Sequence, residues 1–131
     1  MTTLRDLADE RFVSLTTHRR SGEGVPTPVW VVPDGVDGAA VWTPAGSGKV
    51  KRLRRDERVT LRPCDRRGRV ADDAPTVEAR AGVSTEPSDL DRVEGLLRAK
   101  YRLEFRIVGL VERIARRGRG AERAVVAIRP A

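Results

Sequence analysis

Short apolar runs alternate with clusters of turn-forming residues along the first third of the sequence. The runs at residues 12–17, 27–32 and 39–43 are rich in β-branched and aromatic residues, which are typical of strands. HRRSGEG and PDGVDG stand between them, and their glycine, proline and aspartate residues predict tight turns. We therefore expect the domain to begin with a meander of three antiparallel strands.

Four further strands are predicted, at residues 59–64, 76–84, 104–114 and 122–130, the last two joined by a turn at residues 116–120. In the segment at residues 76–84, valine and alanine alternate on one face, as in a half-buried strand. Trp30 and Trp42 lie among valines, which favours strands covered on both faces. A small barrel is the simplest way to cover them.

Two or three short helices are expected in addition to the strands, and two of them can be placed. Ser47 is a suitable N-cap for a helix over residues 49–55, where Val50 and Leu53 are spaced to face the core. Ser88 or Asp89 begins a second helix over residues 90–101, which has apolar residues at helical spacing. The expected fold class is therefore mainly β, a β-barrel with appended helices.

The length of 131 residues suits a single domain over residues 1–131. No apolar run approaches the roughly 18 to 20 residues that span a bilayer, and the first twelve residues lack the apolar segment of a secretory signal. The single cysteine, Cys64, excludes an internal disulfide bond. We expect a soluble protein of the cytoplasm that does not bind membranes.

Positive charge is concentrated in one part of the chain. Residues 49–69 contain ten basic and three acidic side chains, whereas the rest of the chain contains sixteen of each sign, so that this segment accounts for the whole net charge of +7. Such a segment predicts an anionic partner. The alternative interpretation is a solvated, arginine-rich surface.

Several kinds of chemistry lack the residues that they need. The only histidine, His18, lies in a predicted turn, and one histidine with one cysteine shows no metal-ligand spacing, so we expect no metal site. The dinucleotide pattern GxGxxG and the phosphate-loop pattern GxxxxGK[ST] are both missing. Asp72 and Asp73 stand among turn-forming residues. No side chain can be identified as catalytic from the sequence.

The segment GSGKVKR, residues 46–52, has the composition of a phosphate-binding site. Two glycines let a ligand approach the backbone, a helix N-terminus offers N–H groups, and Ser47, Lys49, Lys51 and Arg52 add a hydroxyl and positive charge. Any capped basic helix would look similar. Nucleic acid is a less suitable partner, because no aromatic side chain for base stacking lies within residues 49–69.

Two longer segments carry a family resemblance. FVSLTTHRRSGEGVPTPVWVV and VWTPAGSGKVKRLRRDERVTLRPCDRRGRV together resemble the pyridoxamine 5′-phosphate oxidase-like split β-barrel flavoproteins. The combination of LTT, TPVW, SGKVKR and V-x-L-x-P-C-D is similar to the actinobacterial branch of deazaflavin-dependent oxidoreductases. The resemblance implies a split β-barrel, like that of FMN-binding proteins, which pairs as a homodimer with a cofactor cleft at each subunit interface.

The resemblance also implies which residues bind the cofactor. The residues implied to lie along the ring system are Thr27, Pro28, Val29, Trp30, Trp42 and Thr43, with Thr16 and Thr17 as weaker candidates. The residues implied to hold the phosphate end are Ser47, Lys49, Val50, Lys51 and Arg52.

The implied cofactor is the deazaflavin coenzyme F-420, with FMN as the alternative. The deazaflavin has a long polyanionic tail, and five further arginines supply more charge than one FMN phosphate needs: Arg54, Arg55, Arg66, Arg67 and Arg69. The implied function is hydride transfer from the reduced cofactor to a small organic electrophile, such as an enone or a conjugated tetrapyrrole. The alternatives are an FMN-binding oxidoreductase, a non-catalytic cofactor carrier and a nucleic-acid-binding barrel.

Overall fold

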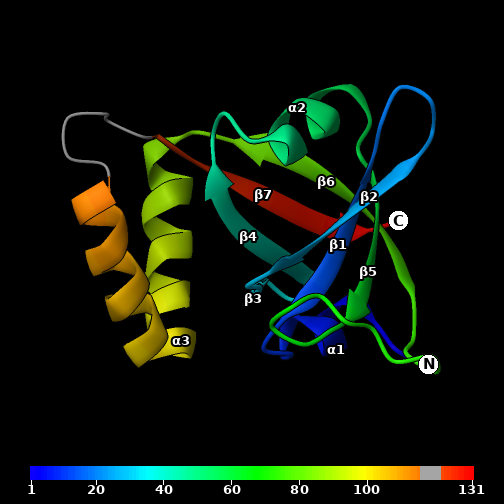
Figure 1. Ribbon diagram of the computed structural model, residues 1–131, viewed down its shortest axis with the longest axis horizontal. Helices are drawn as coiled ribbons and strands as arrows, with labels where there is room; N and C mark the ends of the chain where they lie inside the picture. The colour runs from blue at the N-terminus through cyan, green and yellow to red at the C-terminus, as the bar shows by residue number, and fades with distance from the viewer. Residues whose placement is uncertain (116–121) are drawn as a thin grey trace.

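The computed structural model describes residues 1–115 and 122–131, with side chains over residues 1–102 and 122–131 (Figure 1). The strands within these ranges are β1 Val13–His18, β2 Gly24–Val29, β3 Val32–Asp34, β4 Gly38–Pro44, β5 Arg58–Pro63, β6 Val77–Ser84 and β7 Arg123–Pro130. The helices are α1 Leu4–Ala8, α2 Gly48–Arg55 and α3 Pro87–Ala115. None of the helices in this part of the chain is long and apolar enough to cross a membrane.

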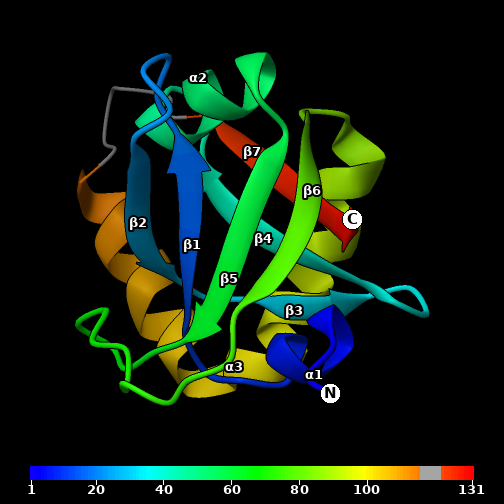
Figure 2. The same cartoon turned by 90° about the vertical axis from the view of Figure 1, so that its right-hand side faces the viewer.

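The strands form one antiparallel sheet in the order β2-β1-β5-β6-β7-β4-β3. The sheet curls, so that β7 and β4 cross behind the layer formed by β2, β1, β5 and β6 (Figure 2). This arrangement confirms the predicted mainly β, barrel-like class. The strands β2 and β3 are the two edges of the sheet, and α3 covers the outer side of the β4–β7 layer (Figure 1).

The predicted three-stranded meander is wrong. The apolar run at residues 27–32 is divided at Trp30 and Val31: β2 pairs with β1, whereas β3 pairs with β4, which itself pairs with β7. The backbone N–H of Val31 donates to the hydroxyl of Tyr101 at 3.0 Å, and the ring of Trp30 stacks on that of Tyr101. A contact with a distant helix therefore interrupts the strand that the local composition favours.

The predicted strand at residues 104–114 is also wrong, because these residues belong to α3. Their apolar residues recur at positions 107, 111 and 114, which is also helical spacing. The β-branched residues of this run favoured a strand in the sequence, but periodicity over such a short run does not separate the two. The helix is interrupted at Arg102, whose φ of 7° and ψ of −83° are not helical. The turn predicted at residues 116–120 lies outside the described residues.

Two groups of buried side chains stabilise the domain. The first fills the curled sheet and includes Leu15 and Leu61, both without exposed surface. The helix α1, which the sequence did not predict, adds Leu4 and Leu7 to this group. The second group lies between the sheet and α3, around Tyr101. Burial of apolar surface on both faces of β4 and β7 explains why these strands are nearly continuous in apolar residues.

Lys100 and Tyr101 join three parts of the chain. The Nζ of Lys100 donates to the carbonyl oxygens of Ala8, Glu10 and Val31, and burial lowers the pKa of Lys100 to about 8. The hydroxyl of Tyr101 lies within hydrogen-bond distance of the carbonyl oxygens of Arg11 and Val31. The α1–β1 connection and the β2–β3 connection are therefore both attached to α3.

Candidate functional site

The first turn of α2 begins as the sequence predicts, with Ser47 as N-cap. The Ser47 Oγ accepts a hydrogen bond from the N–H of Val50 at 3.4 Å and another from the hydroxyl of Thr43 at 3.4 Å. Among the described residues, no acceptor is paired with the N–H groups of Gly48 and Lys49. These two N–H groups, at the positive end of the helix dipole, can bind an anion.

The guanidinium of Arg52 lies over this first turn. Its Nε donates to the Oγ1 of Thr17 at 2.6 Å, and Thr17 is completely buried in β1. A Cβ at position 48 would lie 2.7 Å from Arg52 Nη1, so an alanine there would require the end of the guanidinium to shift. Thr17 orients the guanidinium and Gly48 gives it space.

Helix geometry divides the basic residues of α2 into two groups. Val50 and Leu53 are buried in the core, and Lys49 and Arg52, three residues apart, share one flank of the helix. Lys51 and Arg54 share the other flank and are exposed. The structure therefore brings Ser47, Lys49 and Arg52 together but separates Lys51 from them. The side chain of Val50 is closed to solvent.

The flank with Lys49 and Arg52 is strongly positive. Burial, and then the charge of Arg52, lower the pKa of Lys49. Burial also lowers the pKa of Arg52, and the charges of Arg19 and Arg55 lower it further. In both residues burial is the larger cause of the lowered pKa and neighbouring positive charge the smaller one. A bound anion would offset the repulsion between these cations.

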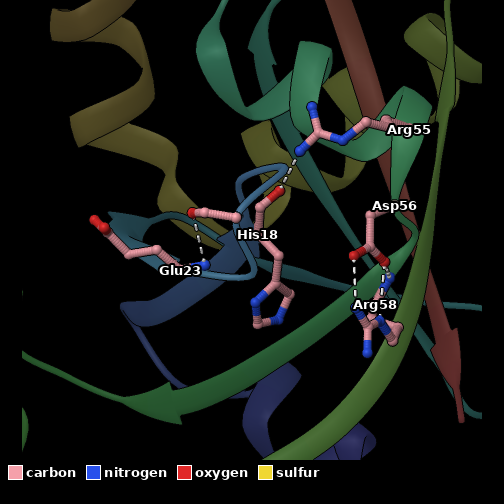
Figure 3. Close-up of polar contacts among 6 residues, drawn as sticks. His18, Glu23, Arg55, Asp56 and Arg58 are labelled. Carbon is pink, nitrogen blue, oxygen red and sulfur yellow. Dashed lines mark hydrogen bonds and ion pairs between the residues drawn. The ribbon is translucent and has the colours of Figure 1, made fainter.

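The neighbouring polar groups do not neutralise this charge. Arg55 donates to the carbonyl oxygen of His18 at 2.8 Å, while the His18 imidazole points away from it (Figure 3). The carboxylate of Asp56 is instead held by Arg58, whose Nη2 lies 2.9 Å from Asp56 Oδ2 (Figure 3). Glu23 lies 3.7 Å from Arg19 in an exposed pair, which contributes little.

The residues expected along a ring system occupy two separate places. Thr27, Pro28 and Val29 lie on the edge strand β2, where Pro28 is exposed and the other two are half-buried. Trp30 stacks on Tyr101, with ring centroids 4.6 Å apart and planes 9° apart. The first three residues are accessible to a ligand, whereas Trp30 is engaged by α3.

Trp42 and Thr43 point to opposite sides of β4, as adjacent strand residues must. Thr43 is 2% exposed and supports Ser47. Trp42 packs with the group around Tyr101, and the guanidinium of Arg123 lies 5.6 Å from its ring centroid. Only Thr43 therefore adjoins the first turn of α2, while Trp42 and Trp30 both pack toward α3. Thr16, the other weak candidate, is half-buried next to Pro26 of β2.

The positive segment is divided between two ends of the sheet. Contacts of Arg52 and Arg55 place α2 at the Thr17–His18 end of β1. The loop after β5 lies at the other end, where the N–H of Cys64 donates to the carbonyl of Phe12. At about 3.3 Å per residue, the five steps along β1 separate the two ends by roughly 17 Å, and Figure 2 shows α2 and this loop at opposite ends of the strands. One anion bound at α2 does not contact both groups.

Sequence reasoning missed the contribution of Arg19 and the function of Gly48. Arg19 follows β1 and acts on Arg52 through space, and no local pattern in the sequence relates the two residues. Gly48 was expected to let a ligand approach the backbone, whereas the structure shows that it makes room for Arg52. The spacing of a glycine four residues before an arginine at a helix start could have indicated this contact.

We expect the substitution Gly48→Ala to weaken binding of inorganic phosphate to the first turn of α2 by about threefold to tenfold, because displacing the guanidinium loses a charge-assisted hydrogen bond. Gly46→Ala is the matched control, since a Cβ at position 46 meets nothing within 4 Å. Titrations followed through the amide resonances of residues 47–50 measure both variants. Equal affinities would show that the position of the Arg52 guanidinium does not matter.

Comparisons with known proteins support the fold. No family model matches the chain, and no curated protein matches it. A protein of unknown function from Agrobacterium tumefaciens superposes with a TM-score of 0.70 at 14% identity over 97% of this chain, which spans about half, 52%, of that protein's length. A candidate pyridoxamine 5′-phosphate oxidase from Listeria innocua has a TM-score of 0.62 at 13% identity, covering 95% of this chain and 86% of the other. An F-420 reductase has a TM-score of 0.59 at 16% identity, covering 100% and 95%. The fold is thus that of the split β-barrels.

Proposed function

We propose that this protein is an oxidoreductase that binds coenzyme F-420 and transfers a hydride to a small organic electrophile. The observation that carries the proposal is the anion site at the start of α2, where Thr17 and Gly48 hold the Arg52 guanidinium over a helix N-terminus. An F-420 reductase with the same fold supports this choice of cofactor.

The phosphate group of the cofactor fits the residues of this site. The N–H groups of Gly48 and Lys49 would donate to its oxygens, as helix N-termini do, and Lys49 and Arg52 would neutralise its charge. The pKa values of Lys49 and Arg52 are lowered by burial and then by neighbouring positive charge, and a bound anion would offset that charge. Thr17 would contribute by orienting the Arg52 guanidinium, and Thr43 by its hydrogen bond to Ser47.

The ring system is assigned to β2, whose residues Thr27, Pro28 and Val29 are exposed or half-buried. Trp30 and Trp42 are not assigned to the ring, since both pack toward α3. The edge of β2 has no strand partner within the described residues. We propose that a second copy of the chain covers this edge and completes the cleft, as a homodimer.

Surplus positive charge near α2 supports the deazaflavin over FMN. This surplus is smaller than the sequence indicated, because some of the arginines lie elsewhere. Arg54 and Arg55 lie on α2, but Arg66, Arg67 and Arg69 lie at the other end of β1. Arg19, which follows β1, adds a positive charge close enough to lower the pKa of Arg52. The cationic groups near α2 still exceed what one phosphate requires, which favours a cofactor with an additional anionic tail.

The bound cofactor supplies the hydride and the electronic part of the chemistry. The residues of this chain contribute positioning: they hold the anionic end and leave β2 open to the ring, so that donor and acceptor can approach to roughly 3 to 3.5 Å. His18 offers no evident acid or base function toward this site, because its carbonyl rather than its imidazole faces Arg55 (Figure 3). The proton that accompanies the hydride would come from water.

A titration of the purified protein with coenzyme F-420 and, separately, with FMN tests the proposal. The fluorescence of each ligand is followed at physiological salt. We expect saturable binding of the deazaflavin at lower concentration than FMN, followed by oxidation of the reduced cofactor when an enone is added. Tighter binding of FMN would identify FMN, and not coenzyme F-420, as the cofactor. Binding of the deazaflavin without turnover of any electrophile would favour the carrier function. Binding of neither ligand would overturn the proposal.

A further inference from the structure

The loop after β5 contains a compact, positively charged turn, residues 65–69, which we name the arginine turn. The N–H of Asp65 donates to the carbonyl of Arg69 at 3.1 Å, and the N–H of Gly68 donates to the carbonyl of Asp65 at 3.0 Å. The Asp65 Oδ1 accepts from the N–H groups of Arg67 and Arg69, both at 2.9 Å. Gly68 has a φ of 87°, which glycine adopts without strain.

This turn is anchored to the sheet at several points. The position of a Cβ on Gly68 would be 3.5 Å from the ring of Pro28 on β2. The N–H of Cys64 donates to the carbonyl of Phe12 at 3.2 Å, and Arg62 Nη2 donates to the carbonyl of Ala74 at 3.0 Å. Both ends of the loop are therefore hydrogen-bonded to other segments of the chain.

Three guanidinium groups of the turn mark it as a charged surface, with Asp65 as a charge neighbour of Arg67 and Arg69. Arg66, Arg67 and Arg69 are exposed, and within the described residues none of them forms an ion pair. The carboxylate of Asp65 accepts hydrogen bonds from backbone N–H groups, chiefly that of Arg69, which lower its pKa. The three arginines and Asp65 line a single shallow depression of about 280 Å³. One ligand in this depression can contact all three arginines.

We propose that the arginine turn binds a small anion with several negative charges, at a site separate from the one at α2. Guanidinium groups bind carboxylate and phosphate oxygens in pairs, and three of them on one depression match a tricarboxylate or a triphosphate. The volume is close to the lower limit for small-molecule sites. The turn lies roughly 17 Å along β1 from the start of α2 but next to Pro28 on β2, so the site is tested with protein that is free of cofactor.

The surroundings of the turn limit the size of the ligand. Asp72 and Asp73 are exposed in the same loop and would repel an extended polyanion. No aromatic residue lies within residues 64–75, so the turn lacks the stacking surfaces that single-stranded nucleic acids use. These features favour a compact ligand over a nucleic acid strand.

Calorimetric titration of the full chain with citrate and with tripolyphosphate tests the site. We expect saturable 1:1 binding of at least one of them to the wild type. The triple variant Arg66→Gln, Arg67→Gln, Arg69→Gln should bind at least about tenfold more weakly, since three charge-assisted contacts are removed. Citrate alone would identify a carboxylate ligand, and tripolyphosphate alone a phosphate ligand.

Two controls separate this site from general charge and from α2. The triple variant Arg20→Gln, Arg54→Gln, Arg80→Gln removes the same charge from exposed positions elsewhere and should bind as the wild type does. Arg52→Gln should also retain this binding. Binding that persists without the three turn arginines, that falls equally in the matched control, or that disappears in Arg52→Gln would overturn the proposal. So would the absence of saturable binding to the wild type.

Discussion

Replacing Arg52 with glutamine should weaken the binding of coenzyme F-420 by about 10- to 150-fold, because a hydrogen bond to a charged group contributes about 1.5–3 kcal/mol. The Arg52 guanidinium is placed over the first turn of α2 by its 2.6 Å hydrogen bond to Thr17. Glutamine is shorter than arginine and carries no charge, so it cannot replace the guanidinium. Folding should be preserved, because the substitution also removes repulsion with Arg19 and Arg55.

Arg54→Gln is the matched control for this experiment, since Arg54 lies on the other flank of α2 and is exposed. Its dissociation constant should stay within about twofold to threefold of that of the wild type, as expected for a screened surface charge. Ligand fluorescence measures both variants, and a urea midpoint for each confirms that they fold. If the two variants lose affinity equally, the anion is held by the overall charge of the helix and not by the guanidinium that Thr17 orients.

Tyr101→Phe should lower the free energy of unfolding by about 1–3 kcal/mol, the cost of leaving buried backbone groups without a partner. Tyr101 is 1% exposed, and burial raises the pKa of its hydroxyl. That hydroxyl accepts from the N–H of Val31 and lies 2.9 Å from the carbonyl oxygen of Arg11. Phenylalanine keeps the ring that stacks on Trp30 but has no group to replace these contacts.

Urea denaturation followed by tryptophan fluorescence measures the Tyr101 effect. Trp30→Leu is the companion variant, because it removes the stacked ring and leaves the hydroxyl in place. We expect Tyr101→Phe to lower the urea midpoint while the emission of Trp30 in the folded protein keeps its wavelength. Trp30→Leu should also change the emission spectrum of the folded protein. An unchanged midpoint for Tyr101→Phe would mean that solvent or another polar group satisfies Val31 and Arg11, and that the hydroxyl does not attach α3 to the sheet.

The local features of the structure could be predicted because neighbouring residues determine them. Ser47 begins α2 because a serine followed by a basic amphipathic segment caps its own helix. The alternation of valine and alanine in β6 and the composition of β1 indicated strands for the same reason. The concentration of charge in residues 49–69 was visible as well. The resemblance to split β-barrels agrees with the fold that the structural comparisons support.

The errors in the sequence interpretation occur where structure outside the local segment overrides a local preference. The run at residues 27–32 looked like one strand, but Tyr101, about seventy residues later, binds Val31 and divides it. Residues 104–114 carried β-branched side chains and still form part of α3. In both places tertiary contacts or helical continuity override a local preference that amounts to only a few tenths of a kcal/mol per residue.

The strands, the serine-capped basic helix and the surplus of positive charge can be inferred from the amino-acid sequence, because each depends on residues close together in the chain. The places where that charge lies on the surface depend on the tertiary structure. Thr17 from β1 selects Arg52 from the basic residues of α2, helix geometry turns Lys51 to the other flank, and β5 carries the three arginines of the turn to the far end of the sheet. Strand pairing and hydrogen bonds between distant residues set these positions, and no local pattern encodes them.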